Sequence, residues 1–281
     1  MRTITRVAEM TAASAAWRKA GKTIGFVPTM GALHEGHLSL VREARRRADV
    51  TVVSIFVNPA QFGPQEDLAR YPRDLARDAA LLENEKVDVL FFPDEAEIYP
   101  PGYRTYVEVH GFQNRLCGAS RPGHFRGVAT VVLKLFNIVR PDLAFFGWKD
   151  AQQLVLLRRM VRDLDVETDI VGLPIVREPD GLAMSSRNGY LSPEERRAAT
   201  VLSRSLEKAE EAVRAGERDA RKLAALVRSA VAAEPLARLD YVEVVDESNL
   251  EPLATIAGDV LVALAVFVGA TRLIDNIRIR A

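Results

Sequence analysis

Short runs of β-branched and aromatic residues alternate with longer amphipathic segments from Thr23 to about Val176, and this alternation constrains the fold of the 281-residue chain most strongly. The run VTVVSIFV at 50–57 is almost continuously apolar, as expected of a strand buried on both faces. Strands that alternate with helices need right-handed crossovers and therefore form a parallel sheet. We predict an α/β fold with a doubly wound, Rossmann-like parallel sheet.

The expected elements follow from hydrophobic periodicity. Strands are predicted at 23–29, 50–57, 87–93, 142–147 and 166–174, with a short candidate strand at 106–109. Helices are predicted at 36–48, 73–85, 128–140 and 149–164. Two long loops, at 58–72 and 111–127, complete this part of the chain.

The pattern changes after residue 176. Two alanine-rich, charged helices are predicted at 193–215 and 218–233, followed by strands at 239–246, 259–269 and 271–279. Ser192, Pro193 and Glu195 form a typical helix start, with serine as the N-cap. We therefore predict a first, Rossmann-like domain at 1–175 and a smaller α+β domain at 176–281.

Composition excludes several classes of protein. Lys+Arg and Asp+Glu both number 38, so the chain lacks the net basic charge that holds nucleic acid. A single cysteine, Cys117, excludes an internal disulfide and a multi-cysteine zinc site. The N-terminus shows no apolar signal segment, and the longest apolar run, 260–270, is too short to span a bilayer. We expect a cytoplasmic protein without a membrane partner.

Two of the chain's four histidines, His34 and His37, lie three positions apart in the segment VPTMGALHEGHLSLV. This segment joins the first predicted strand to a helix, and the N–H groups at such a helix start suit a phosphate. The i, i+3 spacing places both imidazoles on one side of the turn, where they would stabilise charge growing on a phosphate. A metal-binding pair and a purely structural pair are the alternatives.

The loop GLAMSSRNGYL at 181–191 contains a second candidate site for phosphate, Met184-Ser185-Ser186-Arg187. Serine hydroxyls and a guanidinium bind phosphate oxygens well, although the same residues are also common in ordinary turns. Together, the histidine pair and this loop resemble the motifs of α/β enzymes that transfer nucleotidyl groups, in which the first motif holds ATP and the second closes on its phosphates.

Longer motifs make the resemblance more specific. PTMGALHEGHLSLV, SIFVNPAQFGPQEDLARYPR, SRPGHFRGVATVVLKLFNIVRPD, FFGWKDAQQL and MSSRN occur in the order typical of the pantothenate synthetase family, within the His-x-Gly-His nucleotidylyltransferase superfamily, which this chain resembles. The resemblance covers about 20–200 and implies ATP-dependent condensation of pantoate with β-alanine through a pantoyl adenylate, with release of pyrophosphate and AMP. It further implies Mg²⁺ bound with ATP and a homodimer, with no nucleic-acid partner.

The resemblance also implies roles for individual residues. The catalytic residues are His37 as proton donor, His34 and Lys149. ATP is bound by Met30, Gly31, His34, His37, Gly147, Trp148, Lys149, Asp150, Val176, Met184, Ser185, Ser186 and Arg187. Pantoate and β-alanine are bound by Gln61, Gln153, Asn58 and Arg121. No direct metal ligand is assigned, but Asp150 and Asp78 are candidates to lie near Mg-ATP.

His124, Trp148 and Ala151 also lie within these motifs. His124 is interpreted as structural support rather than as a catalytic group. Trp148 and Ala151 depart from the residues that the family usually has on either side of its Lys-Asp pair. Because neither is a group that does chemistry, the departure concerns the shape of the pocket wall and not the activity.

Two other functions stay open from the sequence. One is a different nucleotidyl transferase with the same histidine motif, such as an adenylyltransferase that makes a dinucleotide. The other is a class I aminoacyl-tRNA synthetase, or an inert relative that only binds nucleotide. The neutral charge and the short C-terminal part leave little room for tRNA recognition.

Overall fold

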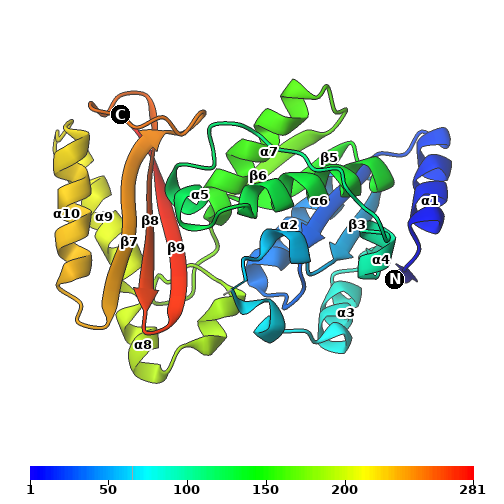
Figure 1. The fold of residues 1–281 in the computed structure, drawn as a ribbon, viewed down its shortest axis with the longest axis horizontal. Coiled ribbons are helices and arrows are strands. Elements are labelled where there is room, and N and C mark those ends of the chain that lie inside the picture. The colour runs from blue at the N-terminus through cyan, green and yellow to red at the C-terminus, as the bar shows by residue number, and fades with distance from the viewer. Residues whose placement is uncertain (65) are drawn as a thin grey trace. The chain divides into compact units, whose positions relative to one another are not determined.

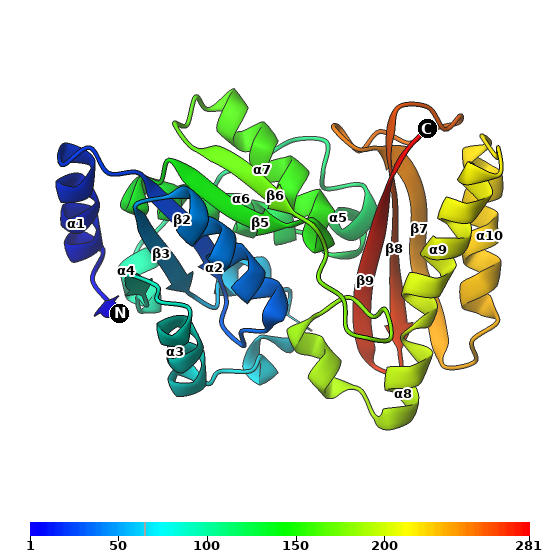
Figure 2. The same cartoon turned by 180° about the vertical axis from the view of Figure 1, so that it is seen from behind.

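The computed structural model describes residues 1–64 and 66–281, shown from two sides in Figures 1 and 2. These residues divide into two compact units. Unit 1 comprises Met1–Trp148 and Leu156–Pro174, and unit 2 comprises Lys149–Val155 and Ile175–Ala281. The sequence-based boundary at 175 differs from this division, because it places 149–155 in the first domain.

Unit 1 contains a six-stranded sheet in the order β1-β4-β3-β2-β5-β6, in which every neighbouring pair is parallel. The strands are β1 (Arg2–Ile4), β2 (Ile24–Thr29), β3 (Val50–Ile55), β4 (Val89–Phe91), β5 (Leu143–Gly147) and β6 (Asp169–Leu173). The chain runs outward from β2 through β3 to β4 and then crosses to the other side of β2 for β5 and β6. The order thus reverses between β2 and β5, where open α/β sheets bind ligands. The predicted Rossmann-like fold is confirmed.

Helices cover both faces of this sheet (Figure 1). The long helices of the unit are α1 (Val7–Lys19), α2 (Glu35–Arg47), α3 (Leu75–Asn84), α6 (His124–Val139) and most of α7 (Ala151–Asp163). Val27 on β2 belongs to the core formed with α2 and α3. Its neighbour Phe26 instead meets Phe136 of α6, with ring centroids 6.4 Å apart. Consecutive strand residues are buried on opposite faces, which explains why the strands lack a polar alternation.

Unit 1 also contains several short elements, and it differs from the sequence-based expectations in three places. The short elements are η1 (Pro59–Gln61), η2 (Asp67–Arg70), α4 (Glu95–Ile98) and α5 (Leu116–Ser120), and η3 (Trp148–Asp150) begins in unit 1 with Trp148 and continues in unit 2. The sequence predicts no element before residue 23, yet α1 and β1 form there. The candidate strand at 106–109 is wrong, because Val107 N–H donates to Thr130 Oγ1 at 2.9 Å and 103–109 are irregular. The helix predicted from 128 begins at His124, after Gly123 with a φ of 81°.

Unit 2 is built on an antiparallel sheet of β7 (Ala237–Asp246), β8 (Asp259–Val268) and β9 (Thr271–Arg280), in that order. The helices α9 (Val201–Arg214) and α10 (Ala220–Ala232) cover one face, as Figure 2 shows, and share a hydrophobic core with the strands. The predicted second, α+β region is confirmed. The helix predicted at 193–215 is interrupted at 199–200, so it forms α8 (Pro193–Ala198) and α9.

The predicted start of α8 is confirmed in detail. Ser192 Oγ accepts from the N–H of Glu195 at 3.2 Å, and Glu195 Oε2 accepts from the N–H of Ser192 at 2.8 Å. This reciprocal capping satisfies two donors that the helix itself leaves unpaired. Over the whole described chain, no helix combines the length and the apolar character that crossing a membrane requires.

Candidate active site

The loop that follows β2 has an unusual backbone conformation. Gly31 and Ala32 have φ values of 84° and 51°, in the left-handed region that costs energy for alanine. Asp78 on α3, which is 1% exposed, accepts from the N–H of Ala32 at 2.7 Å and from the N–H of Leu33 at 2.9 Å. Thr29 Oγ1 accepts from the N–H of Gly31 at 3.2 Å. These side chains hold the loop in its strained form.

His34 and His37 lie together at the start of α2, where His34 is the N-cap. Their ring centroids are 4.1 Å apart and the planes are tilted by 41°. The backbone N–H of His34 donates to His37 Nδ1 at 3.3 Å. Because Nδ1 of His37 is an acceptor, the proton of the neutral ring is on Nε2. His37 is therefore arranged to donate from Nε2.

The turn after β3 brings Met30, Asn58 and Gln61 into one cluster. Asn58 is 1% exposed, and its Nδ2 donates to Gln61 Oε1 at 2.9 Å and to the carbonyl of Gly127 at 3.1 Å. Gln61 Nε2 donates to Met30 Sδ at 3.2 Å. A thioether is a weak acceptor, so this amide keeps most of its capacity to donate.

Arg121 and His124 bind the backbone of the same turn. The Arg121 guanidinium donates to both carboxylate oxygens of Glu66, at 2.7 and 2.5 Å, and its Nη1 lies 3.0 Å from His124 Nε2. His124 Nδ1 lies 2.8 Å from the carbonyl oxygen of Gln61, so Nδ1 is the donor and Nε2 accepts from Arg121. These contacts agree with a supporting role for His124. Direct binding of pantoate or β-alanine by Arg121 stays a prediction.

Charge and burial act in opposite directions on Glu66. Burial tends to raise the pKa of its carboxyl, but hydrogen bonds and charge from Arg121 prevail and hold that pKa below its ordinary value. The carboxylate is therefore ionised at neutral pH and remains a partner of Arg121.

Lys149 and Asp150 belong to unit 2 and follow β5 on η3. Lys149 Nζ lies 3.7 Å from Asp150 Oδ2, and the carboxylate side chain is 51% exposed. The carbonyl of Lys149 accepts from Asn276 Nδ2 on β9 at 3.1 Å. Gln153 follows on α7 and is half-buried.

Trp148, the residue before Lys149, directly follows the end of β5 at Gly147 and belongs to unit 1. The Arg158 guanidinium carbon lies 5.2 Å from the centroid of the Trp148 ring, a cation–π contact. Trp148 and Ala151 are each 4% exposed. Both departures from the family pattern are therefore packing positions.

The loop with the Met-Ser-Ser-Arg sequence is also part of unit 2. The N–H of Met184 donates to the carbonyl of Val176 at 3.0 Å, so these two predicted ATP-binding positions are backbone partners. Ser185 caps the short helix η4 (Ser186–Tyr190), and its Oγ accepts from the N–H of Arg187 at 3.3 Å. The predicted residues Met184, Ser185, Ser186 and Arg187 thus lie at the start of η4.

Sequence reasoning missed two residues on β9 that support these segments. Asp275 is 2% exposed and accepts from the Arg177 guanidinium at 2.7 and 3.0 Å. Burial raises the pKa of Asp275, and Arg177 opposes that rise. Its neighbour Asn276 is the residue that holds the Lys149 carbonyl. The adjacent polar pair inside the run TRLIDNIRI was the available signal, because it interrupts the apolar alternation of the strand.

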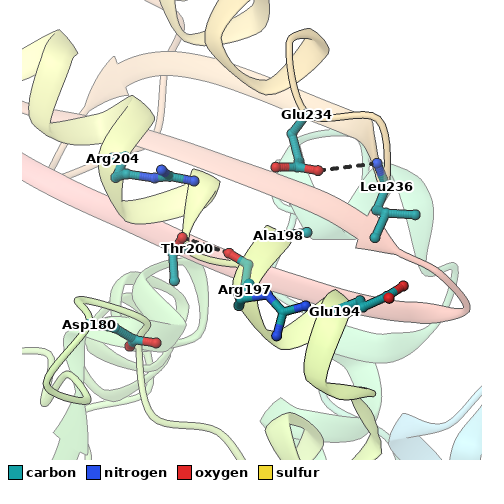
Figure 3. Close-up of a pocket in the computed structure, with 8 residues that line it drawn as sticks. All are labelled: Asp180, Glu194, Arg197, Ala198, Thr200, Arg204, Glu234 and Leu236. Carbon is teal, nitrogen blue, oxygen red and sulfur yellow. Dashed lines mark hydrogen bonds between the residues drawn. The ribbon is translucent and has the colours of Figure 1, made fainter.

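Unit 2 also has an open surface hollow of about 520 Å³ (Figure 3). The residues that line it are Asp180, Glu194, Arg197, Ala198, Thr200, Arg204, Glu234 and Leu236. None of the predicted site residues lines this hollow, so it has no part in the candidate site. Among the described residues, no three His, Cys, Asp or Glu side chains form a group that could hold a metal ion.

Comparisons with known proteins agree on one family. The family model for pantoate-β-alanine ligase matches residues 2–278. Pantothenate synthetase of Heliobacterium modesticaldum is 60% identical over 276 residues, 98% of each chain. The crystal structure of pantothenate synthetase from Thermus thermophilus covers 100% of both chains at 48% identity, with a TM-score of 0.95. Pantoate-β-alanine ligase from Francisella tularensis, solved with Beta-gamma ATP and β-alanine, has a TM-score of 0.82 at 36% identity and covers 99% of this chain and 97% of that one.

Proposed function

The chain belongs to the pantoate-β-alanine ligase family, and on that basis we propose how its residues carry out the reaction. Its activity is the ATP-dependent synthesis of pantothenate from pantoate and β-alanine. The full-length relatives compared above are pantothenate synthetases or pantoate-β-alanine ligases, which favours this activity over the dinucleotide-forming and aminoacyl-tRNA alternatives.

The reaction has two covalent steps. A pantoate carboxylate oxygen attacks the α-phosphorus of ATP, the bond to the β-phosphate oxygen breaks, and pyrophosphate leaves with that electron pair. This step is needed because a carboxylate is a poor electrophile until its oxygen becomes part of a good leaving group. The amine of β-alanine then attacks the acyl carbon, AMP leaves, and the nitrogen loses a proton to form the amide of pantothenate.

The phosphates are assigned to four kinds of group. His37 donates from Nε2 toward the α-phosphate, and His34 adds a second imidazole on the same turn. Lys149 contributes positive charge to the oxygens that leave with pyrophosphate. Ser185, Ser186 and Arg187 bind the phosphates by hydroxyl and guanidinium hydrogen bonds. The remaining ATP contacts are Met30, Gly31, Gly147, Trp148, Asp150, Val176 and Met184.

Pantoate is assigned to two neutral amides, Gln61 and Gln153. Neutral donors suit a substrate whose hydroxyls must be recognised and whose carboxylate must still react, because a charged partner would bind that oxygen too tightly. Asn58 supports Gln61 through the hydrogen bond described above. Arg121 is also assigned to pantoate and β-alanine. It acts either by holding the turn that contains Gln61 or by contacting a substrate directly.

Mg²⁺ is expected to arrive with ATP and to neutralise phosphate charge. The residues present fit a metal held mainly by phosphate and water. Asp150 has an exposed carboxylate beside Lys149, which suits contact with a hydrated ion. Both oxygens of Asp78 accept backbone hydrogen bonds, which favours a role in holding the loop over a role in binding the metal. We further propose a homodimer in the cytoplasm, with no nucleic-acid or membrane partner.

The observation that carries this assignment is the geometry of His37, whose Nδ1 is bound to the backbone and whose Nε2 is therefore the donor. ATP–pyrophosphate exchange tests the function. Labelled pyrophosphate should enter ATP only when pantoate and Mg²⁺ are present, and β-alanine should not be required. Exchange that depends on an amino acid instead of pantoate would contradict the assignment.

A further inference from the structure

A chain of hydrogen bonds leads from Tyr99 to the proposed pantoate-binding amide of Gln61. The Tyr99 hydroxyl donates to Asn58 Oδ1 at 2.8 Å. Asn58 Nδ2 then donates to Gln61 Oε1 at 2.9 Å. Tyr99 follows α4 and is separated from Asn58 by 41 positions in the sequence. It belongs to none of the motifs on which the family resemblance depends.

Backbone groups determine the orientation of the Asn58 amide. Asn58 Nδ2 lies 3.1 Å from the carbonyl of Gly127, which can only accept. Asn58 Oδ1 lies 3.3 Å from the N–H of Ala60, which can only donate. A reversed amide would place donor against donor and acceptor against acceptor. The group that Asn58 offers to Gln61 is therefore an N–H.

The orientation of the Gln61 amide follows directly. Because Asn58 donates, the Gln61 atom that faces it must be the carbonyl oxygen Oε1. Nε2 then points to the other side, where it meets the weakly accepting sulfur of Met30 at 3.2 Å. Gln61 thus presents N–H donors, so the substrate atom that it recognises is an acceptor, a hydroxyl or carboxylate oxygen.

Tyr99 makes a shorter hydrogen bond to Asn58 Oδ1 than the backbone does, and it is itself firmly held. Its ring centroid lies 5.0 Å from that of Tyr103 and 6.2 Å from that of Phe56. Burial raises the pKa of Tyr99 well above its ordinary value, so its hydroxyl keeps its proton and remains a donor. Loss of this bond would leave Asn58 Oδ1 to the longer contact with Ala60.

We propose that Tyr99 is a positioning residue for pantoate: through Asn58, its hydroxyl holds the Gln61 amide with the N–H groups directed at a substrate oxygen. This inference rests on the proposed role of Gln61 and extends it by one residue that does not touch the substrate.

The test is Tyr99→Phe, which removes the hydroxyl and keeps the ring. We expect the KM for pantoate to rise about five-fold, which corresponds to the loss of one neutral buried hydrogen bond. The KM values for ATP and β-alanine should change by less than about two-fold. Tyr103→Phe is the matched control, because it removes the adjacent phenol hydroxyl and leaves the bond to Asn58 in place. Melting temperatures of both variants verify that they fold.

A double-mutant cycle with Gln61→Ala separates positioning from general stabilisation. If Tyr99 acts through Gln61, Tyr99→Phe should have no further effect on the KM for pantoate in the Gln61→Ala background. Additive effects, or an unchanged KM in Tyr99→Phe while Gln61→Ala raises it, would overturn the positioning role alone. An unchanged KM for pantoate in Gln61→Ala would instead overturn the proposed function of Gln61.

Discussion

At the scale of single residues, the backbone decides which nitrogen of His37 carries the proton. His37 Nδ1 accepts from the N–H of His34, so Nε2 is the donor. The same logic applies to His124, whose Nδ1 faces the Gln61 carbonyl and whose Nε2 faces Arg121. Two histidines of one unit are thus held in opposite tautomers by their hydrogen bonds.

His37→Ala tests the first of these residues. We expect the rate of pantoyl-adenylate formation in single-turnover experiments to fall by about 10² to 10³, as for other well-placed donors to a charged transition state. Ser39→Ala is the control on the same helix, since Ser39 Oγ donates to the nearby carbonyl of Gly36 at 2.8 Å. Near-normal adenylation by a folded His37→Ala protein would remove His37 from the chemistry.

At the scale of elements, the start of α6 shapes the turn that contains Gln61. A Cβ at Gly127 would lie 2.2 Å from the carbonyl oxygen of Ala60 and 2.6 Å from the N of Gln61. Helix and turn therefore approach so closely that only glycine fits. The same residue also supplies the carbonyl that orients Asn58.

Gly127→Ala should push η1 away from α6. We expect the KM for pantoate to rise by more than about ten-fold and the free energy of unfolding to fall by about 1–3 kcal/mol, the usual cost of overpacking. Gly63→Ala is the matched control, because the nearest atom to a Cβ there would be Glu66 Cγ at 3.7 Å, an ordinary contact. If both substitutions changed the KM for pantoate equally, the close approach of α6 to the turn would not determine pantoate binding.

At the scale of the whole molecule, the proposed homodimer has a physical basis in the parallel sheet. β6 is exposed or half-exposed along its length and lies at the edge of the described sheet, with β5 as its neighbour. An unpaired strand edge offers backbone donors and acceptors to another chain. The formal net charge of zero means that long-range repulsion between copies is weak.

Sedimentation equilibrium tests the homodimer. We expect a mass twice the 31.1 kDa of the chain at micromolar concentration, unchanged when ATP is added. Val171→Lys, in the middle of β6, should shift the mass toward the monomer if this edge is the contact, and its melting temperature verifies that the variant folds. A monomer at every concentration would contradict the proposal.

Much of the fold was predictable because its signals are local. The periodic runs that become β2, β3, β5 and α2 were identified within a few residues of their ends. β1 was missed because three residues carry no usable periodicity, and it is a strand only through its pairing with β4. The prediction of one continuous helix at 193–215 is wrong, because the chain turns at 199–200 and nothing in the local pattern marks that turn.

The order of residues alone specified the succession of strands and helices and, through contiguous motifs, the family and the candidate side chains for its chemistry. How those side chains are held was decided only in the folded molecule. Tyr99 reaches Asn58 across 41 positions, and Asp78 reaches Ala32 across 46. Such contacts form only after the crossovers bring distant loops to one edge of a sheet. Periodicity and spacing within the chain therefore cannot predict them.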